Sequence, residues 1–329
     1  MRAWLLDELN GIGGLRLADV PDPSPRENEV VMRVHYASLN PADRYLAERQ
    51  YPAKPALPHI LGRDGMGTVE QLGPGVTQLR PGDRRAILRS EVGVTRAGTF
   101  AQRVAVPVDN LVEIPEGWSD TQAAGATLVY LTAYQALTMW GTPAPGALVL
   151  ITGASGGVGA ASVHLAHAMG CRVLALSRSP EKSRRLREQG AHMTFDPQDP
   201  EWRRTAKTAI APRRVDLAID NIGGTLLPEV IELLGDKGKV SLVGRLAGPV
   251  PEFNTATLFF RRIRMGGVAL PAWNNAETRA AWSEVLRLLA LTKARPLVDC
   301  VLPFADLPKA FARLAEGPMG KVVVEVDRS

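Results

Sequence analysis

The feature that most constrains the fold of this chain is a glycine-rich run, Leu150-Ile151-Thr152-Gly153-Ala154-Ser155-Gly156-Gly157-Val158-Gly159. Residues 147–152 form an apolar strand candidate and residues 159–169 a helix candidate, so the run is a strand-to-helix turn. Gly156 and Gly157 let backbone N–H groups approach a pyrophosphate, and Gly159 lets the helix pack close to the strand. The positive end of the helix dipole adds to this attraction. The run therefore predicts a dinucleotide-binding turn; the alternative is a sharp turn without a ligand.

The next strand candidate indicates which dinucleotide would bind. Residues 172–176 are apolar and are followed by Ser177 and Arg178. NAD sites carry an acidic residue about 20 positions after the turn, where it bonds the ribose hydroxyls. Arg178 stands there instead, and a cation suits the 2′-phosphate of NADP(H), with Lys182 adding charge nearby. We predict NADP(H) rather than NAD. Either Arg184 or Arg185 could contact the phosphate, or both could belong to the solvated face of a helix over 180–189.

Two kinds of pattern divide the chain. Strand candidates at 29–36 and 67–72 lie among Gly and Pro turns, which predicts a small barrel or sandwich. After residue 118 strands and helices alternate, with further strands at 215–220 and 239–243, which predicts a parallel sheet covered by helices on both faces. A helix over 307–316 and a strand over 321–326 close the chain, and we expect that strand to return to the first domain.

Composition excludes several classes of protein. A length of 329 residues fits about two domains. The only cysteines are Cys171 and Cys300, so a disulfide scaffold is excluded and a reducing cytoplasm is expected. No apolar run approaches the roughly 18 residues of a membrane span. The net charge of +5 is spread along the chain and does not predict nucleic-acid binding.

Several segments, in order, resemble one known family. These are the Asn-Pro-x-Asp stretch and the glycine-rich strand entry, then a Gly-Thr-Phe-Ala motif, a Leu-Thr-Ala-Tyr motif and a C-terminal strand: 38–43, 61–69, 98–101, 131–134 and 320–323. In this order they resemble the medium-chain dehydrogenase/reductases, within them the zinc-free quinone oxidoreductase-like branch, over nearly the whole chain.

The resemblance implies an α/β fold with two domains and a homodimer formed through the nucleotide domain. A GroES-like β-rich catalytic domain would comprise residues 1–118 and 265–329, and a Rossmann doubly wound parallel sheet residues 119–264. The active site would lie in the cleft between them. The expected cofactor contacts, from the turn, the strand ends and the resemblance together, are Thr132, Ala154, Ser155, Gly156, Gly157, Val158, Ser177, Arg178, Lys182, Asn221, Val243, Gly244 and Arg245.

The same resemblance bears on a catalytic metal. The zinc-binding members of the superfamily use two cysteines and a histidine, which align with Asn40, Arg63 and Leu128. None of these is a usual zinc ligand, and the Arg63 cation would repel the ion. We expect no metal.

Without a metal, the easiest hydride acceptors are already activated, such as quinones and alkenes conjugated to a carbonyl. Their reduction produces an oxyanion, which needs hydrogen-bond donors. The candidates are Asn40, Tyr51 and Tyr130, with Asp43 and Asp64 as supporting carboxylates; solvent is a further candidate for the proton donor.

Three functions fit these features. The first is an NADPH-dependent quinone or enone reductase acting on a small molecule. The second is an enoyl-thioester reductase acting on a CoA or carrier-protein substrate. The third is a sensor or RNA-binding relative that binds NADPH without turnover. The stretches that would shape the substrate pocket carry no decodable motif.

Overall fold

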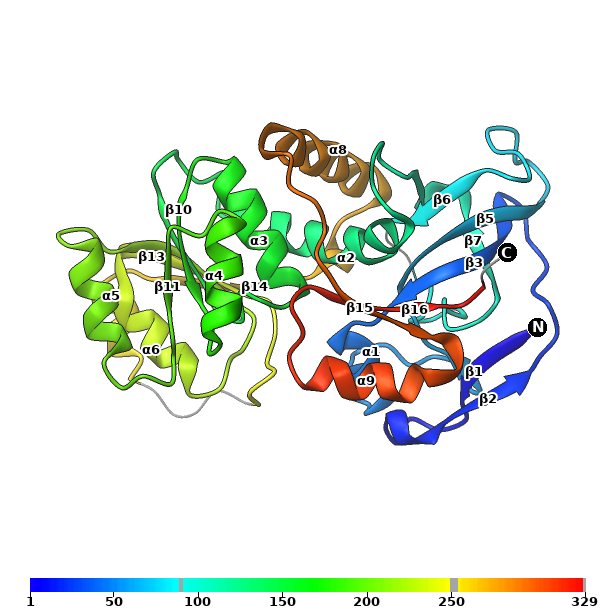
Figure 1. Cartoon of the computed structure of the whole chain (residues 1–329), viewed down its shortest axis with the longest axis horizontal. Coiled ribbons are helices and arrows are strands. Elements are labelled where there is room, and N and C mark those ends of the chain that lie inside the picture. The colour runs from blue at the N-terminus through cyan, green and yellow to red at the C-terminus, as the bar shows by residue number, and fades with distance from the viewer. Residues whose placement is uncertain (89–90, 249–253, 328–329) are drawn as a thin grey trace. The chain divides into compact units, whose positions relative to one another are not determined.

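The computed structural model describes residues 1–88, 91–248 and 254–327 (Figure 1). The chain divides into two compact units, each with its own sheet. The first unit comprises Met1–Leu128 with Arg295–Ser329, and the second comprises Val129–Ala294. Among the described residues, no helix is long and apolar enough to cross a membrane.

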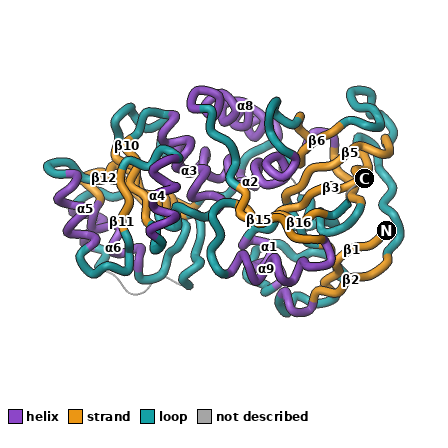
Figure 2. Tube along the Cα trace, in the orientation of Figure 1, coloured by secondary structure: helices purple, strands orange, loops and turns teal. Residues whose placement is uncertain are grey.

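The first unit is built on strands, as Figure 2 shows. Its seven-stranded sheet has the order β15-β16-β3-β5-β6-β8, with β7 paired to β3, and a three-stranded sheet has the order β2-β1-β4. The strands are β1 (Arg2–Leu6), β2 (Leu15–Asp19), β3 (Glu29–Ser38), β4 (His59–Ile60), β5 (Asp64–Leu72), β6 (Arg84–Ile87), β7 (Arg103–Pro107), β8 (Leu111–Glu113), β15 (Val298–Pro303) and β16 (Lys321–Glu325). The helices are α1 (Pro41–Ala47), α9 (Leu307–Ala315) and the short turns η1 (Ile12–Gly14), η2 (Val108–Asn110) and η4 (Phe304–Asp306).

The end of the chain completes this unit. β16 pairs antiparallel with β3, which places Val323 opposite Ser38. The Trp4 indole N–H donates to the Phe304 carbonyl at 2.9 Å. Phe311 packs edge-to-face on Phe100, with ring centroids 5.9 Å apart. Because Val322, Val323 and Val324 are fully buried, this strand belongs to the apolar core of the sheet.

The second unit contains a six-stranded parallel sheet with the order β11-β10-β9-β12-β13-β14. In Figure 1, α3 and α4 lie on one side of this sheet and α5 and α6 on the other. The strands are β9 (Leu148–Ile151), β10 (Arg172–Leu176), β11 (Met193–Phe195), β12 (Val215–Asp220), β13 (Leu234–Leu242) and β14 (Arg264–Gly267). Helix α2 (Asp120–Thr138) belongs to this unit from Val129 onward. The other helices are α3 (Gly157–Ala168), α4 (Pro180–Glu188), α5 (Trp202–Ile210), α6 (Leu226–Leu233), α7 (Ala256–Phe260), α8 (Asn275–Thr292) and the turn η3 (Leu270–Ala272). This strand order is that of a doubly wound sheet, so the predicted fold class is confirmed.

The unit boundaries differ from the divisions expected after residues 118 and 264. β14 pairs with β13, and α8 packs against α3, so the segment from Met265 to Ala294 belongs to the second unit. Helix α2 begins in the first unit and ends in the second. A sequence pattern identifies an amphipathic helix but does not show which sheet the helix covers, so it could not place these limits.

Candidate active site

The glycine-rich turn has the geometry that its sequence predicts. Gly153 has a φ of +55°, a conformation that favours glycine. A side chain on Gly159 would overlap the Gly153 carbonyl oxygen, so only glycine fits there. No side chain of the described residues caps the start of α3, and its first turn contains no acidic residue. The N–H groups at this helix end therefore remain available for an anion.

Hydrogen bonds join the ends of β9 and β12 beside this turn. The Thr152 hydroxyl donates to Asp220 at 2.7 Å and accepts from the Asn221 backbone N–H at 2.9 Å. The Asn221 side-chain amide donates to the Thr152 carbonyl at 2.8 Å. Its other end, Asn221 Oδ1, is buried and has no hydrogen-bond partner among the described residues. A buried acceptor without a partner is costly, so Oδ1 is a candidate contact for a ligand hydroxyl.

The end of β13 reaches the same edge of the sheet. The backbone N–H groups of Val243 and Gly244 donate to the Asp220 carbonyl at 2.8 and 3.3 Å. A side chain on Gly244 would come within 2.7 Å of the Asn221 carbonyl oxygen. Arg245 follows and is exposed. The expected contacts Asn221 and 243–245 therefore lie together at the carboxyl edge, where open α/β sheets bind ligands.

The expected phosphate-binding residues follow β10. Ser177 is buried, and Arg178 is exposed with no partner among the described residues. The Ser179 hydroxyl caps α4 by accepting from the Lys182 backbone N–H at 3.3 Å. On α4, Arg184 forms an ion pair with Glu188, as the solvated-face interpretation predicts for one of the two arginines. Arg178 is thus a cation that remains available for a phosphate.

Two of the expected residues lie on α2. Thr132 is half-buried, whereas Tyr130 is almost fully buried. The Tyr130 hydroxyl lies 2.7 Å from His164 Nδ1, and His164 Nε2 lies 2.7 Å from Gln189 Oε1. Burial lowers the pKa of His164 to about 4, so the ring is neutral. Its Nε2–H donates to Gln189, and its Nδ1 accepts the Tyr130 proton.

This bond uses the only proton of the Tyr130 hydroxyl. Burial also raises the pKa of that hydroxyl, which opposes its ionisation. We therefore place Tyr130 outside the group of proposed donors, as part of the packing of the second unit.

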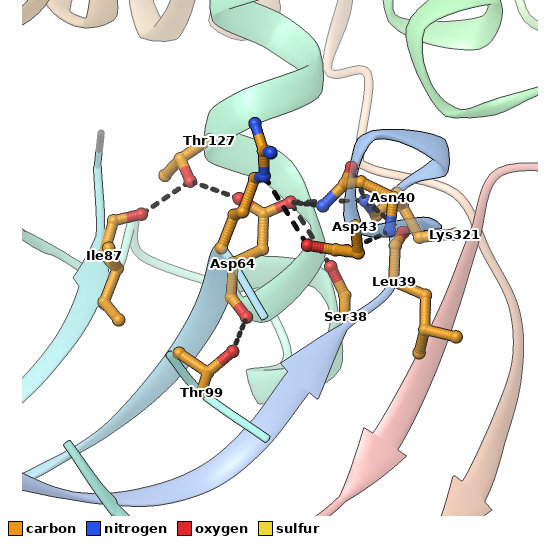
Figure 3. Close-up of polar contacts among 10 residues, drawn as sticks. Ser38, Leu39, Asn40, Asp43, Asp64, Ile87, Thr99, Thr127 and Lys321 are labelled. Carbon is orange, nitrogen blue, oxygen red and sulfur yellow. Dashed lines mark hydrogen bonds and ion pairs between the residues drawn. The ribbon is translucent and has the colours of Figure 1, made fainter. Parts of the chain in front are cut away.

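In the first unit, Asn40 belongs to a closed group of hydrogen bonds (Figure 3). Its amide Nδ2 donates to Asp64 Oδ2 at 3.0 Å, and its Oδ1 accepts from Lys321 Nζ at 2.6 Å. Lys321 Nζ also donates to Asp64 Oδ2 at 3.2 Å and to the Leu39 carbonyl at 2.9 Å. Ser38 and Thr127 lie 3.4 and 3.3 Å from the Asp64 carboxylate oxygens. Asn40, Asp64 and Lys321 are all buried. We call these three residues the Asn40 triad.

A second pair of opposite charges adjoins the triad. Asp43 is fully buried; its Oδ2 accepts from the Asn40 backbone N–H at 2.8 Å, and its Oδ1 lies 3.5 Å from Arg63 Nε. Burial raises the pKa of Asp43 to about 6, and Arg63 opposes this rise. The Arg63 guanidinium also stacks over the Tyr51 ring at 4.2 Å, which holds Tyr51 on this side of α1. The expected residues Asn40, Asp43 and Tyr51 are therefore brought together.

Sequence reasoning missed Lys321 as a member of this group. The residue was visible only as the start of an apolar C-terminal strand. A charged residue directly before three buried valines is a usable indication, because lysine is almost never fully buried unless it is paired.

In the part of the chain that the structure describes, no three His, Cys, Asp or Glu side chains are grouped as a metal site would require.

Comparison with known proteins gives related sequences and folds. Two family models match: the alcohol dehydrogenase GroES-like domain over residues 26–116 and the zinc-binding dehydrogenase over residues 157–290. The quinone oxidoreductase of Mus musculus is 31% identical over 333 residues, which cover 98% of this chain and 97% of that protein. The acryloyl-coenzyme A reductase of Sulfurisphaera tokodaii is 24% identical over 335 residues, with 95% and 96% covered. The structure of mycobacterial Rv1454c complexed with NADPH matches with a TM-score of 0.89 and 26% identity, covering 99% of this chain and 100% of that one.

Proposed function

Because the chain belongs to the quinone oxidoreductase-like branch of the medium-chain dehydrogenase/reductases, we propose that it uses NADPH to reduce a quinone or an α,β-unsaturated carbonyl compound without a catalytic metal. The observation that carries this proposal is the state of the Asn40 amide. Its oxygen faces the Lys321 ammonium group, so the amide is oriented to offer an N–H to a ligand. Such a group recognises a carbonyl oxygen and stabilises the oxyanion formed from it.

The residues of the second unit fit a dinucleotide. The uncapped start of α3 suits a pyrophosphate, and Asn221 Oδ1 suits a sugar hydroxyl. Arg178 suits the 2′-phosphate that distinguishes NADPH from NADH. When bound, the nicotinamide supplies the hydride. Further contacts are proposed for Thr132, Ala154, Ser155, Gly156, Gly157, Val158, Ser177, Lys182, Val243, Gly244 and Arg245.

The residues of the first unit fit the acceptor side of the reaction. Addition of hydride to a quinone or to a conjugated alkene leaves negative charge on the carbonyl oxygen. Asn40 N–H would donate to that oxygen, and Tyr51, whose hydroxyl has no partner among the described residues, would supply a second donor. The final proton would come from Tyr51 or from solvent.

Charge at this site argues against a metal ion. Arg63 and Lys321, whose side chains are 9% and 5% exposed, each place a cation within the group that surrounds Asn40. Asp64 and Asp43 already pair with these cations, so no free anionic ligand remains among them. A further cation would be repelled at short range in a poorly solvated site. We propose that hydrogen-bond donors replace a Lewis acid here.

Two measurements test this function. Fluorescence titration of the purified protein with NADPH and NADH should show tighter binding of NADPH. Absorbance at the NADPH band should then fall with quinones or enones as acceptors. Equal or better NADH binding would reject the role of Arg178 in cofactor choice. Binding of neither cofactor, or no NADPH oxidation over a panel of both acceptor classes, would reject the enzyme function.

A thioester substrate is the second candidate, because one relative is an acryloyl-coenzyme A reductase. Its acceptor is also an alkene conjugated to a carbonyl, so the same Asn40 N–H would serve. Faster turnover of crotonyl-CoA than of simple enones would favour it. Tight NADPH binding without turnover of any acceptor would instead favour a sensor.

We further propose a cytoplasmic homodimer formed through the second unit. β14 is the edge strand of the six-stranded sheet, and an unpaired edge can extend across two copies of a chain. Light scattering of the purified protein should give the mass of two chains, and the mass of one chain would reject the dimer.

A further inference from the structure

Lys321 carries a charge into the apolar core of the first unit. Its side chain is 5% exposed, and the valines that follow it in β16 are fully buried. All three Nζ protons have acceptors: the Leu39 carbonyl, Asn40 Oδ1 and Asp64 Oδ2. The ammonium group is therefore fully satisfied and has no proton left to give to a ligand.

Stability alone does not account for this lysine. Replacing a buried ion pair by well-packed apolar residues is often neutral or stabilising, because desolvation offsets the attraction between the charges. The lysine stem is nonetheless accommodated closely: a side chain on Gly125 would come within 3.1 Å of the Lys321 Cβ and Cγ atoms. The site is thus shaped around a long cationic side chain whose end meets Asn40.

The register of three strands places Lys321 next to Asn40. Ser38 pairs with Asp64 on β5 and with Val323 on β16, and the Leu39 N–H donates to the Val322 carbonyl at 3.0 Å. These pairings bring the end of β3, the start of β5 and the start of β16 to one point. Asn40 follows β3 after one residue, Leu39, and its side chain lies between Asp64 and Lys321 (Figure 3).

We propose that Lys321 is a positioning residue that fixes the orientation of the Asn40 amide, so that a single N–H is directed to the substrate carbonyl oxygen. The ammonium group accepts no hydrogen bond, so Asn40 Oδ1, and not Nδ2, must face it. Asp64 then takes one of the two Nδ2 protons, and the other remains for a ligand. Without Lys321 only the Asp64 contact would hold the amide, so the remaining N–H would lose its fixed direction toward the oxyanion. This inference rests on the function proposed above.

A double-mutant cycle on turnover tests the proposal. The variants are Lys321→Met, Asn40→Ala and the combination of both. We expect Lys321→Met to lower kcat at least 10-fold and to leave the NADPH affinity unchanged. If the lysine acts through Asn40, the combined variant should have the kcat of Asn40→Ala alone. Multiplying effects, or an unchanged kcat in Lys321→Met, would overturn the proposal.

Two further variants separate positioning from loss of structure. Lys321→Met leaves Asp64 as an unpaired buried charge, whereas Lys321→Met combined with Asp64→Asn removes both charges and should restore the melting temperature. The neutral pair should nevertheless keep the low kcat, because no cation then faces Asn40 Oδ1; recovery of kcat together with the melting temperature would overturn the proposal. Lys309→Met, at a 74% exposed position of α9, is the matched control and should change neither quantity.

A crystal structure of Lys321→Met gives a readout that does not depend on turnover. The proposal predicts that the Asn40 amide rotates away from the orientation in which Nδ2 donates to Asp64 Oδ2 and Oδ1 faces residue 321, and an unmoved amide would overturn it. If the unaltered protein reduces no acceptor but the amide turns in Lys321→Met, the function proposed above fails and the positioning role stands.

Discussion

The glycine-rich turn and the Asn40 triad are built in opposite ways. The turn presents backbone N–H groups, and its specificity comes from side chains that must be absent, above all at Gly159. The triad presents one side-chain N–H and depends on side chains that must be present, since Asp64 and Lys321 hold Asn40 from both ends. The first arrangement suits a ligand that many proteins share, and the second suits one particular acceptor. This difference fits the proposal that the turn provides cofactor affinity and that the triad serves the chemical step.

The largest effect is expected from a methyl group in the turn. Gly159→Ala would place Cβ on the Gly153 carbonyl, so the start of α3 must shift. We expect no measurable NADPH binding and an unfolding free energy lower by about 1–3 kcal/mol. Calorimetry and fluorescence titration would measure both. Gly267→Ala, where the added atom meets nothing within 4 Å, is the control in the same unit and should change neither.

Asn40→Ala should affect the Asn40 triad and leave the glycine-rich turn intact. It removes the proposed donor to the developing oxyanion, a loss that lowers kcat by about 100-fold in comparable sites. The dissociation constant for NADPH should stay the same, because the proposed cofactor contacts lie in the second unit. Steady-state kinetics at saturating NADPH would measure the first quantity. A kcat within a factor of three of the unaltered protein would show that Asn40 is not the donor.

Arg178→Asp should change cofactor affinity and not the chemical step. It should weaken the binding of NADPH but not that of NADH. A carboxylate in place of the cation repels a 2′-phosphate, so NADPH should bind about 10-fold or more weakly, the equivalent of roughly 1.4 kcal/mol. NADH lacks that phosphate and should bind as before or better. Arg184→Asp is the matched control, because Arg184 is already paired with Glu188. Equal losses for NADPH and NADH would remove Arg178 from the phosphate site.

The smallest effect concerns Asp43 and depends on pH. Burial raises the pKa of Asp43 in the folded protein to about 6, above the ordinary value of 3.8. Its stabilising contribution is therefore complete below about pH 3.8 and is lost as the pH rises through 6. Between pH 5 and 8 the unfolding free energy should fall by about 1 kcal/mol from this group.

The side chain of the Asp43→Asn variant cannot titrate, so the unfolding free energy of that variant should not show this fall. Urea denaturation at pH 5 and at pH 8 would measure it. The variant also leaves Arg63 without its partner, but this cost is the same at both pH values and so does not affect the change of unfolding free energy with pH. Asp19→Asn, at an exposed carboxyl, should keep the slope of the unaltered protein. Identical slopes for Asp43→Asn and the unaltered protein would contradict the raised pKa.

The two regions also differ in how far the sequence could predict them. The turn is contiguous, so residues 150–159 are enough to predict a strand, a helix start and a position where only glycine fits. The sequence also predicts that the ends of β9, β12 and β13 lie at one edge, because all strands of a parallel sheet point the same way. The ion pair of Arg184 with Glu188 follows from helix spacing.

The triad could not be predicted in the same way. It joins residues 40, 64 and 321, which are far apart in the chain, and their meeting depends on the register of β3 with β5 and β16. Asn40 was found through family resemblance, and Lys321 was missed because a local pattern does not reveal a partner nearly 300 residues away. Tyr130 was a reasonable donor by residue type, but its bond to His164 depends on how α2 packs in the second unit.

The most direct test of this division is a single-turnover experiment that compares Asn40→Ala with Arg178→Asp. Each protein would be premixed with enough NADPH to saturate it and then mixed rapidly with a quinone or an enone. The account predicts that Asn40→Ala keeps its NADPH affinity and loses the rate of NADPH oxidation, whereas Arg178→Asp loses affinity and keeps the rate at saturation. Loss of both quantities in each variant, or the reverse assignment, would contradict it.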